Sequence, residues 1–205
     1  FNQLNIKKDI KINNIDIRNF EKLNNYIKTI KPEIIFHLAA QPIISKGYEN
    51  PKYTYEVNSL GTLNVVEILK KNKFVKAAIF VTSDKCYQSN NSTTGFKEND
   101  KLGGIDPYSG SKACAEIIVN TYFHSFFKKN NHCGVATARA GNVIGGGDWS
   151  IDRLIPDAIK SLNNKKTIII RNPSFNRPWQ HVLEPLNGYL ELAQKLYYDP
   201  IKYSG

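Results

Sequence analysis

The sequence predicts an α/β fold in which helices cover both faces of a doubly wound parallel sheet. Short apolar runs that are typical of buried strands occur at 34–40, 77–82 and 134–140. Longer stretches with apolar residues at helical spacing separate these runs. Strands that alternate with long helices form right-handed βαβ units, so we expect these strands to run parallel in one sheet.

The N-terminal part of the chain predicts one more strand and a helix. Apolar and polar residues alternate at 10–17, which predicts a strand that ends near Asp16. Apolar residues at helical spacing predict a helix over 20–30. After the strand at 34–40, residues 41–50 are expected to form a loop.

Two long helices are predicted in the middle of the chain. The first starts at Pro51 and continues to Lys71. Gly61 lies in its middle, where glycine costs about 1 kcal/mol relative to alanine, so we expect a close packing contact there. The second helix is predicted over 107–128, with Asp106 as its N-cap and a proline in its first turn.

The rest of the chain is more irregular. Residues 88–105 are rich in Asn, Ser, Thr and Gly and are expected to form a surface loop. Glycines 145–147 predict a tight turn, since they lack the spacing of a phosphate-binding loop. We therefore divide the chain into a sheet domain at 1–147 and a smaller region at 148–205, interleaved with the sheet. The elements expected in this region are a helix at 152–162, a strand at 167–170 and a helix at 185–198.

The chain of 205 residues has a formal net charge of +10, from 28 Lys and Arg against 18 Asp and Glu. The basic residues are interleaved with acidic ones and form no dense block, which argues against a nucleic-acid partner. A basic binding module is the alternative, and salt-sensitive binding to nucleic acid would support it.

The cysteines and histidines exclude other classes of protein. Cys86, Cys114 and Cys133 show no Cys-x-x-Cys spacing, which favours a reducing compartment, the cytoplasm, over a disulfide scaffold. The histidines show no metal-ligand spacing, so no metal is expected. No apolar run reaches the roughly 18 residues of a membrane span, so no membrane partner is expected.

Residues that could perform chemistry gather at one strand end and one helix start. Ser83, Asp84 and Lys85 follow the buried strand at 77–82, and Tyr108 and Lys112 share one face at the start of the next helix. Open α/β sheets build active sites at such carboxyl ends of strands. A nearby ammonium favours the phenolate, which can then take a proton from an alcohol. For Tyr108 and Lys112, the alternative is a Tyr-x-x-x-Lys pattern that occurs by chance. For residues 83–85, the alternative is a solvated turn.

These residues carry a resemblance to a known family. The chain resembles the extended short-chain dehydrogenase/reductase family of nucleotide-sugar enzymes, which have a Rossmann-like fold, and within it the CDP-glucose 4,6-dehydratases. Lys85 stands where most of the larger family has glutamate. The runs at 82–87 and 177–184 are specific to this group. The further matching runs are 37–42, 102–112, 138–149 and 152–157.

The resemblance implies a dehydration of CDP-glucose that yields a 4-keto-6-deoxy sugar for deoxysugar and lipopolysaccharide O-antigen biosynthesis. Tyr108, activated by Lys112, takes the proton of the 4-hydroxyl while hydride passes from C4 to NAD. Ser83 holds that oxygen. Lys85 removes the C5 proton, which requires a lowered pKa. Asp84 protonates the departing 6-hydroxyl, which requires a raised pKa, and hydride then returns to C6.

The resemblance also implies binding residues. Asp16 and Ile17 match positions that contact the adenine of NAD, and Leu38, Ala39 and Ala40 match the small residues that let the backbone approach it. Tyr108 and Lys112 belong to both the catalytic and the cofactor-binding sets.

For the nucleotide sugar, Asn142 matches a position near the substrate, and Arg177 matches an arginine that clamps the pyrophosphate. Ser83 also belongs to this set. Arg153 and Arg171 are further candidates, for which an ordinary surface arginine is the alternative.

The chain begins with Phe1 and contains no methionine, so we expect an internal fragment of a longer enzyme. By the resemblance, it lacks the glycine-rich turn, the first two strands and part of the C-terminal domain. Such a fragment would bind NAD weakly and be inactive. The full-length protein is expected to be a homodimer through the helices at 51–71 and 107–128. Another nucleotide-sugar 4,6-dehydratase or epimerase, or an inactive truncated remnant, is the alternative function.

Overall fold

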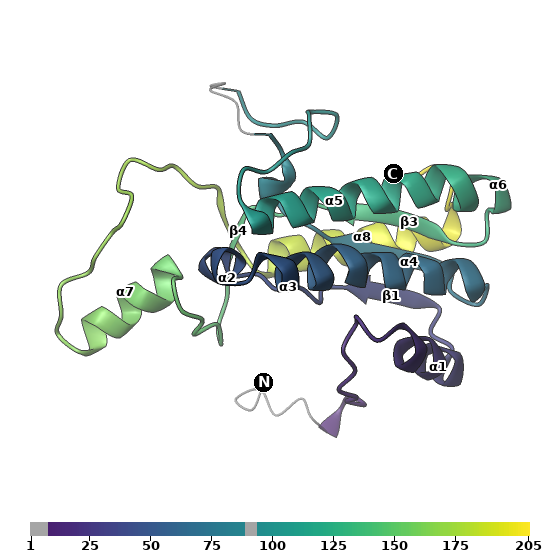
Figure 1. Cartoon of the computed structure of the whole chain (residues 1–205), viewed down its shortest axis with the longest axis horizontal. Coiled ribbons are helices and arrows are strands. Elements are labelled where there is room, and N and C mark those ends of the chain that lie inside the picture. The colour runs from purple at the N-terminus through teal and green to yellow at the C-terminus, as the bar shows by residue number, and fades with distance from the viewer. Residues whose placement is uncertain (1–7, 89–93) are drawn as a thin grey trace.

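The computed structural model describes residues 8–88 and 94–205 of the chain (Figure 1). Its centre is a parallel sheet of β1 (Ile34–His37), β2 (Ala77–Val81) and β3 (Gly134–Ala138), in the spatial order β1-β2-β3. All three neighbouring registers are parallel, with Ile34 opposite Ala77 and Ala77 opposite Gly134. The three buried strands predicted from the sequence are therefore confirmed, each somewhat shorter than expected.

Helices cover both faces of this sheet, as the doubly wound prediction requires (Figure 1). On one face, Phe80 of β2 packs in a buried cluster with Val65 of α4 (Gly61–Lys71) and Val119 of α5 (Pro107–Tyr122). On the other face, Ile79 packs against Leu196 of α8 (Leu183–Tyr198). Successive side chains of a strand point to opposite faces, so β2 supplies both cores. The Rossmann-like α/β class is confirmed.

The first long helix contains a π-helical turn. It consists of α3 (Pro51–Tyr55), the π turn Glu56–Leu60, and α4. A Cβ added at Gly61 would lie 2.5 Å from Cδ1 and 2.9 Å from Cγ1 of Ile17. The close packing contact expected at Gly61 is therefore confirmed.

The second long helix begins as predicted. The side chain of Asp106 accepts a hydrogen bond from the backbone N–H of Ser109, and a proline occupies the first turn of α5. The helix continues through a π turn, Phe123–Phe127, and α6 (Lys128–Asn130). The expected helix α1 (Phe20–Ile30) is also present.

Two strand predictions are wrong among the described residues. No strand forms at 10–17, where Ile10 and Ile12 are exposed, and none forms at 167–170, where Ile169 is exposed. Neither segment has a neighbouring strand, so the local pattern gains no ladder of backbone hydrogen bonds. The loop expected at 41–50 contains a short helix, α2 (Ile44–Glu49). Of the loop expected at 88–105, residues 89–93 lie outside the described residues.

A second parallel pair was missed. β4 (Asn142–Ile144) pairs with β5 (Trp179–His181), and the two are joined through α7 (Leu154–Asn163). In Figure 1, α7 stands away from the sheet at the end of extended segments. The helices expected at 152–162 and 185–198 correspond to α7 and α8.

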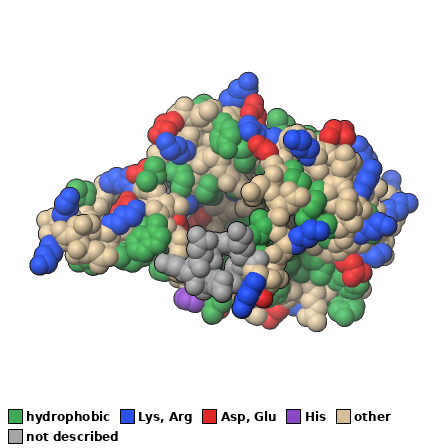
Figure 2. Space-filling model, turned by 90° about the horizontal axis from the view of Figure 1, so that it is seen from below, with side chains coloured by type: hydrophobic (Ala, Val, Ile, Leu, Met, Phe, Trp, Pro, Cys, Tyr) green, Lys and Arg blue, Asp and Glu red, His purple; other side chains and the backbone are tan. Residues whose placement is uncertain are grey.

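The charged surface shows no concentrated basic patch on the face seen in Figure 2, where Lys and Arg side chains lie scattered among acidic and hydrophobic ones. None of the helices in the described ranges has the length and apolar character needed to cross a membrane.

Candidate functional site

The end of β2 turns sharply into a short 3₁₀ helix, Asp84–Cys86. Ser83 caps this turn, because its Oγ accepts a 3.2 Å hydrogen bond from the backbone N–H of Lys85. The Ser83 hydroxyl also donates to Oδ1 of Asp84 at 3.1 Å. The turn is anchored on the neighbouring strand end, since the Asp84 N–H donates to the carbonyl oxygen of Ala140 at 3.2 Å. The three predicted catalytic side chains therefore leave the sheet at its carboxyl edge.

Tyr108 meets this turn from the first turn of α5. The Tyr108 phenol lies close enough to the Ser83 hydroxyl for that hydroxyl to affect its pKa, although the two residues belong to different elements. Burial raises the pKa of the Tyr108 phenol, and the Ser83 hydroxyl opposes that rise. Ser83 and the positive charge of Arg153 thus favour the phenolate in this structure.

Lys112 is anchored on the strand that leads into this turn. Its Nζ donates a 3.0 Å hydrogen bond to the carbonyl oxygen of Val81, and its side chain is buried. Burial lowers the pKa of Lys112 to about 8, against the smaller raising effect of Glu116. We expected the Lys112 ammonium to lower the pKa of Tyr108, but that pKa is raised. The reason is that both groups are desolvated and that Lys112 is engaged by the strand backbone.

Lys85 lies in an environment that suits a base. Burial lowers the pKa of Lys85, and the positive charges of Arg177 and Arg153 lower it further. The carboxylates of Asp84 and Asp106 oppose this effect. The direction agrees with the requirement that Lys85 be neutral in order to accept a proton.

The predicted substrate arginines are placed differently from one another. Arg177 lines a cavity of about 1190 Å³ that also contains Asp84. Arg153 donates from Nη2 to the carbonyl oxygen of Pro42 at 3.2 Å, and its buried Nε has no hydrogen-bond partner. Arg171 is exposed and forms a 2.8 Å ion pair with Asp152. The positive charges of Arg177 and Arg153 lower the pKa of Lys85, whereas the Arg171 guanidinium is held by the Asp152 carboxylate.

Asn142, the other predicted substrate residue, begins β4. Its backbone N–H donates to the carbonyl oxygen of Pro178 at 2.9 Å, directly after Arg177 in the chain. This contact brings the two predicted substrate residues from distant parts of the sequence to one place.

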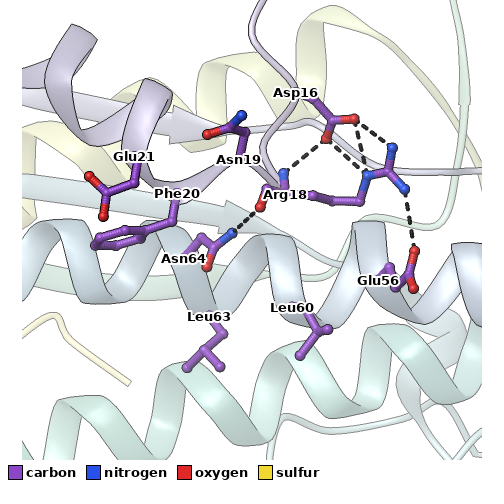
Figure 3. A pocket seen from close by; sticks show the side chains of 9 residues that line it. All are labelled: Asp16, Arg18, Asn19, Phe20, Glu21, Glu56, Leu60, Leu63 and Asn64. Carbon is purple, nitrogen blue, oxygen red and sulfur yellow. Dashed lines mark hydrogen bonds and ion pairs between the residues drawn. The ribbon is translucent and has the colours of Figure 1, made fainter.

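The predicted adenine site lies beside a pocket of about 730 Å³ (Figure 3). Both carboxylate oxygens of Asp16 accept hydrogen bonds from Arg18, the shortest at 2.7 Å from Nη2. Arg18 also bonds Glu56 at 3.3 Å and lies over the ring of Tyr53. An adenine amine would therefore have to share the Asp16 carboxylate with Arg18. Ile17 packs instead against Gly61.

The small residues at the end of β1 fit a cofactor that approaches the backbone. Leu38 and Ala39 are exposed and Ala40 is half-buried at the carboxyl end of the strand. These positions lie at the same edge of the sheet as Ser83, since β1 and β2 run parallel. The exposed backbone and the nearby phenol are compatible with a dinucleotide at this edge.

Sequence reasoning missed two residues next to the site. His37, at the end of β1, is buried, and its Nε2 lies 3.2 Å from Oγ1 of Thr62. Burial lowers the pKa of His37 to about 4. Glu116 lies one helical turn after Lys112 on α5 and is 3% exposed. The spacing Tyr108, Lys112, Glu116 was a signal for this residue, because all three positions share a helix face.

No group of three His, Cys, Asp or Glu side chains that could hold a metal ion occurs within residues 8–88 and 94–205.

The comparisons with known proteins give the family of the chain. The family model described as GDP-mannose 4,6 dehydratase matches residues 2–201. The chain is 51% identical to the CDP-glucose 4,6-dehydratase of Salmonella typhimurium over 193 residues, which are 92% of this chain and 54% of that protein. The chain spans about half the length of this curated relative.

Two solved structures share the fold. A dTDP-glucose 4,6-dehydratase from Bacillus anthracis in complex with NAD is similar at a TM-score of 0.79 and 26% identity, covering 95% of this chain and 58% of that one. A UDP-glucose 4-epimerase from Thermotoga maritima with UDP-glucose has a TM-score of 0.83 and 20% identity, covering 94% and 61%. The second likeness shows the fold alone.

Proposed function

Because the chain belongs to the GDP-mannose 4,6-dehydratase family, we propose that the protein is an NAD-dependent nucleotide-sugar 4,6-dehydratase that acts on CDP-glucose. The observation that carries this proposal is the placement of Ser83, Asp84 and Lys85 at the end of β2, next to Tyr108 at the start of α5. This placement joins the strand end and the helix start into one site whose groups match a proton-transfer reaction. The 51% identity to a CDP-glucose 4,6-dehydratase supports the choice of substrate.

The first step assigned to this chain is removal of a proton from the sugar 4-hydroxyl. Tyr108 accepts this proton, and Ser83, which lies beside the phenol, holds the same sugar oxygen. Bound NAD would supply a reversible acceptor for the hydride that leaves C4 and later returns to C6. Asp16, Ile17, Leu38, Ala39, Ala40, Tyr108 and Lys112 are the residues that would hold it.

The second step is elimination of water across C5 and C6. The ketone at C4 acidifies the C5 proton, and neutral Lys85 accepts it. Asp84 gives a proton to the 6-hydroxyl, which leaves as water. The lowered pKa of Lys85 supports this assignment, because a lysine with an ordinary pKa near 10.5 would be an ammonium at neutral pH. Asp84 lies beside Lys85 in the same turn.

The nucleotide part of the substrate is assigned to the arginines. Arg177 binds the pyrophosphate, and Asn142 lies next to it through the contact of its backbone with Pro178. Arg153 is a second cation near Lys85. Arg171 would have to release Asp152 before it could contribute.

The product, a 4-keto-6-deoxy sugar nucleotide, places the protein in the biosynthesis of deoxysugars such as those of lipopolysaccharide O-antigens. Three free cysteines, Cys86, Cys114 and Cys133, support a cytoplasmic location. We also propose a homodimer through the two long helices, where Leu60 and Ile117 are each more than half exposed. Light scattering on the purified protein would measure its mass.

The decisive experiment incubates the natural protein with NAD and CDP-glucose and follows the 4-keto-6-deoxy product by its absorbance in alkali. Tyr108→Phe is expected to abolish product formation. Tyr122→Phe is the matched control on the same helix, because its hydroxyl bonds Glu67 away from the site. Activity that survives in Tyr108→Phe would refute the proposed role.

Parallel reactions with dTDP-glucose, UDP-glucose and GDP-mannose test the alternative substrates. A product that keeps its 6-hydroxyl and is inverted at C4 would identify an epimerase, the second candidate. No turnover of any of the four would count against a catalytic function.

A further inference from the structure

Glu116 is a buried carboxylate that accepts hydrogen bonds from three side chains at the ends of two different strands. It accepts hydrogen bonds from Oγ1 of Thr82, from Oγ1 of Thr137 at 2.7 Å and from Nη2 of Arg139 at 2.7 Å. Thr82 directly follows β2, and Thr137 and Arg139 lie at the end of β3. We call these four residues the Glu116 cluster. The cluster ties α5 to both strand ends at the carboxyl edge of the sheet.

The cluster holds the start of the turn that carries the proposed catalytic residues. Thr82 is the residue before Ser83, and its backbone N–H donates to the carbonyl oxygen of Ala138 at 2.9 Å. The side chain of Thr82 is therefore fixed to Glu116 while its backbone is fixed to β3. Any shift of α5 along the sheet would pull on this residue and hence on Ser83.

The same cluster holds the end of that turn. Nη1 of Arg139 donates to the hydroxyl of Tyr87 at 3.0 Å and to the carbonyl oxygen of Glu98 at 2.8 Å. The guanidinium also lies 4.9 Å from the centre of the Tyr87 ring, which stacks on Phe96. The turn at 83–86 is thus clamped at Thr82 on one side and at Tyr87 on the other.

This arrangement is more elaborate than packing requires. Replacing a buried ion pair by apolar side chains of similar volume is often neutral for stability, so burial alone does not explain a carboxylate with these partners. Reacting groups supplied by two elements need a fixed separation, and a misplacement of about 1 Å can cost on the order of 100-fold in rate.

We propose that Glu116 is a positioning residue, which holds the turn bearing Ser83, Asp84 and Lys85 in register with the helix that bears Tyr108 and Lys112. This inference rests on the proposed function, because it assigns a role in the same site. Glu116 itself touches no reacting atom in this scheme. It acts through Thr82 and Arg139.

Glu116 also faces Lys112, one turn earlier on α5. Cys86 in the 3₁₀ turn also acts on the charge of Lys112, and Lys112 in turn acts on His37 of β1, whose pKa is lowered to about 4, mainly by burial. Burial raises the pKa of the Cys86 thiol to about 12, so it is neutral at pH 7. Removing the carboxylate of Glu116 would take away the charge that most favours the Lys112 ammonium, and its proton would be lost at lower pH.

The first test is Glu116→Gln in the natural protein, with Glu67→Gln as the matched control. Glu67 also accepts from a partner on α5, Tyr122, but it lies on α4 away from the strand ends. In Glu116→Gln, kcat for dehydration is expected to fall by roughly 10- to 100-fold with little change in KM. The alkaline limb of the kcat profile should move to lower pH. If Glu116 only filled space, neither the fall in kcat nor the shift of the alkaline limb would be expected.

A second measurement does not depend on turnover. Hydrogen exchange at the backbone N–H groups of Thr82 and Asp84, which bond Ala138 and Ala140, should be faster in Glu116→Gln than in wild type. Glu67→Gln should leave it unchanged. If Glu116→Gln does not fold, Thr137→Val removes a single hydrogen bond and should show a smaller effect in the same direction.

The outcomes separate the two proposals. A wild-type protein that turns over none of the sugar nucleotides refutes the proposed function, while the exchange measurement still decides whether Glu116 holds the turn. An active wild type with unchanged kcat, pH profile and exchange in Glu116→Gln overturns the positioning role.

Discussion

Lys112 and Val81 are joined by a 3.0 Å hydrogen bond from Nζ to the carbonyl oxygen at the end of β2. The contact places a buried ammonium at the point where the strand turns into Ser83. Burial lowers the pKa of Lys112 to about 8. Desolvation of this buried ammonium destabilises the folded state, and its hydrogen bond to the backbone fixes its position next to the site.

The stability of the protein should therefore depend on pH through Lys112. The pKa of Lys112 is about 8 in the folded state and has the ordinary lysine value of 10.5 in the unfolded chain, so between these pH values the unfolded chain binds more protons. Between pH 8 and pH 10.5, Lys112 should raise the free energy of unfolding of the wild type by about 3 kcal/mol. Lys112→Met lacks the titration, and its stability relative to wild type should fall over the same range. Urea unfolding of both proteins below pH 8 and near pH 10.5 measures this difference. An equal change in the free energy of unfolding of the two proteins would contradict the prediction.

His37 should make the protein sensitive to acid. Its pKa is lowered from 6.5 to about 4 by burial, so the unfolded chain binds the extra proton first as the pH falls. Stability should decrease between these two values, by about 3 kcal/mol. His37→Gln removes the titration and should shift acid unfolding to lower pH. His124→Gln, at an exposed histidine, is the control and should unfold at the same acidic pH as the wild type.

Gly61 should not tolerate a side chain. Gly61→Ala gains helix propensity, but its Cβ would lie 2.5 Å from Cδ1 of Ile17, so a net loss of about 1–3 kcal/mol is expected. Gly188, within α8, has no atom within 4 Å of an added Cβ, so Gly188→Ala should stabilise by roughly 0.5–1 kcal/mol. Thermal unfolding measures both. Adding Ile17→Ala to Gly61→Ala should recover part of the loss, and equal effects at the two glycines would refute the packing argument.

Lys85 should be needed for elimination but not for oxidation. Lys85→Ala is expected to oxidise C4 of CDP-glucose and to stop there, because no group takes the C5 proton. NMR of the sugar would show a 4-ketone that keeps its 6-hydroxyl and no exchange of the C5 proton with solvent. Lys85→Arg keeps a long basic side chain, but a guanidinium stays protonated and cannot act as a base. Normal dehydration by either variant would show that Lys85 is not the base.

Short-range patterns predicted much of the fold. The apolar run at 77–82 predicted β2, and Asp106 followed by a proline predicted the start of α5. These signals depend on residues within one or two turns of each other. The spacing of Tyr108 and Lys112 placed them on one face for the same reason. The strand predicted at 10–17 failed because an alternating pattern forms a strand only when a neighbour supplies hydrogen bonds.

The sequence by itself determined which side chains stand at the carboxyl edge of the sheet, since strand ends and helix starts are local features. Only the tertiary structure decided their chemistry. Burial sets the direction in which the pKa values of Lys85, Tyr108 and Lys112 move. Arg18 takes the Asp16 carboxylate, and Glu116 joins α5 to two strand ends. Desolvation and contacts between distant segments exist only when the elements pack, and no window of neighbouring residues contains them.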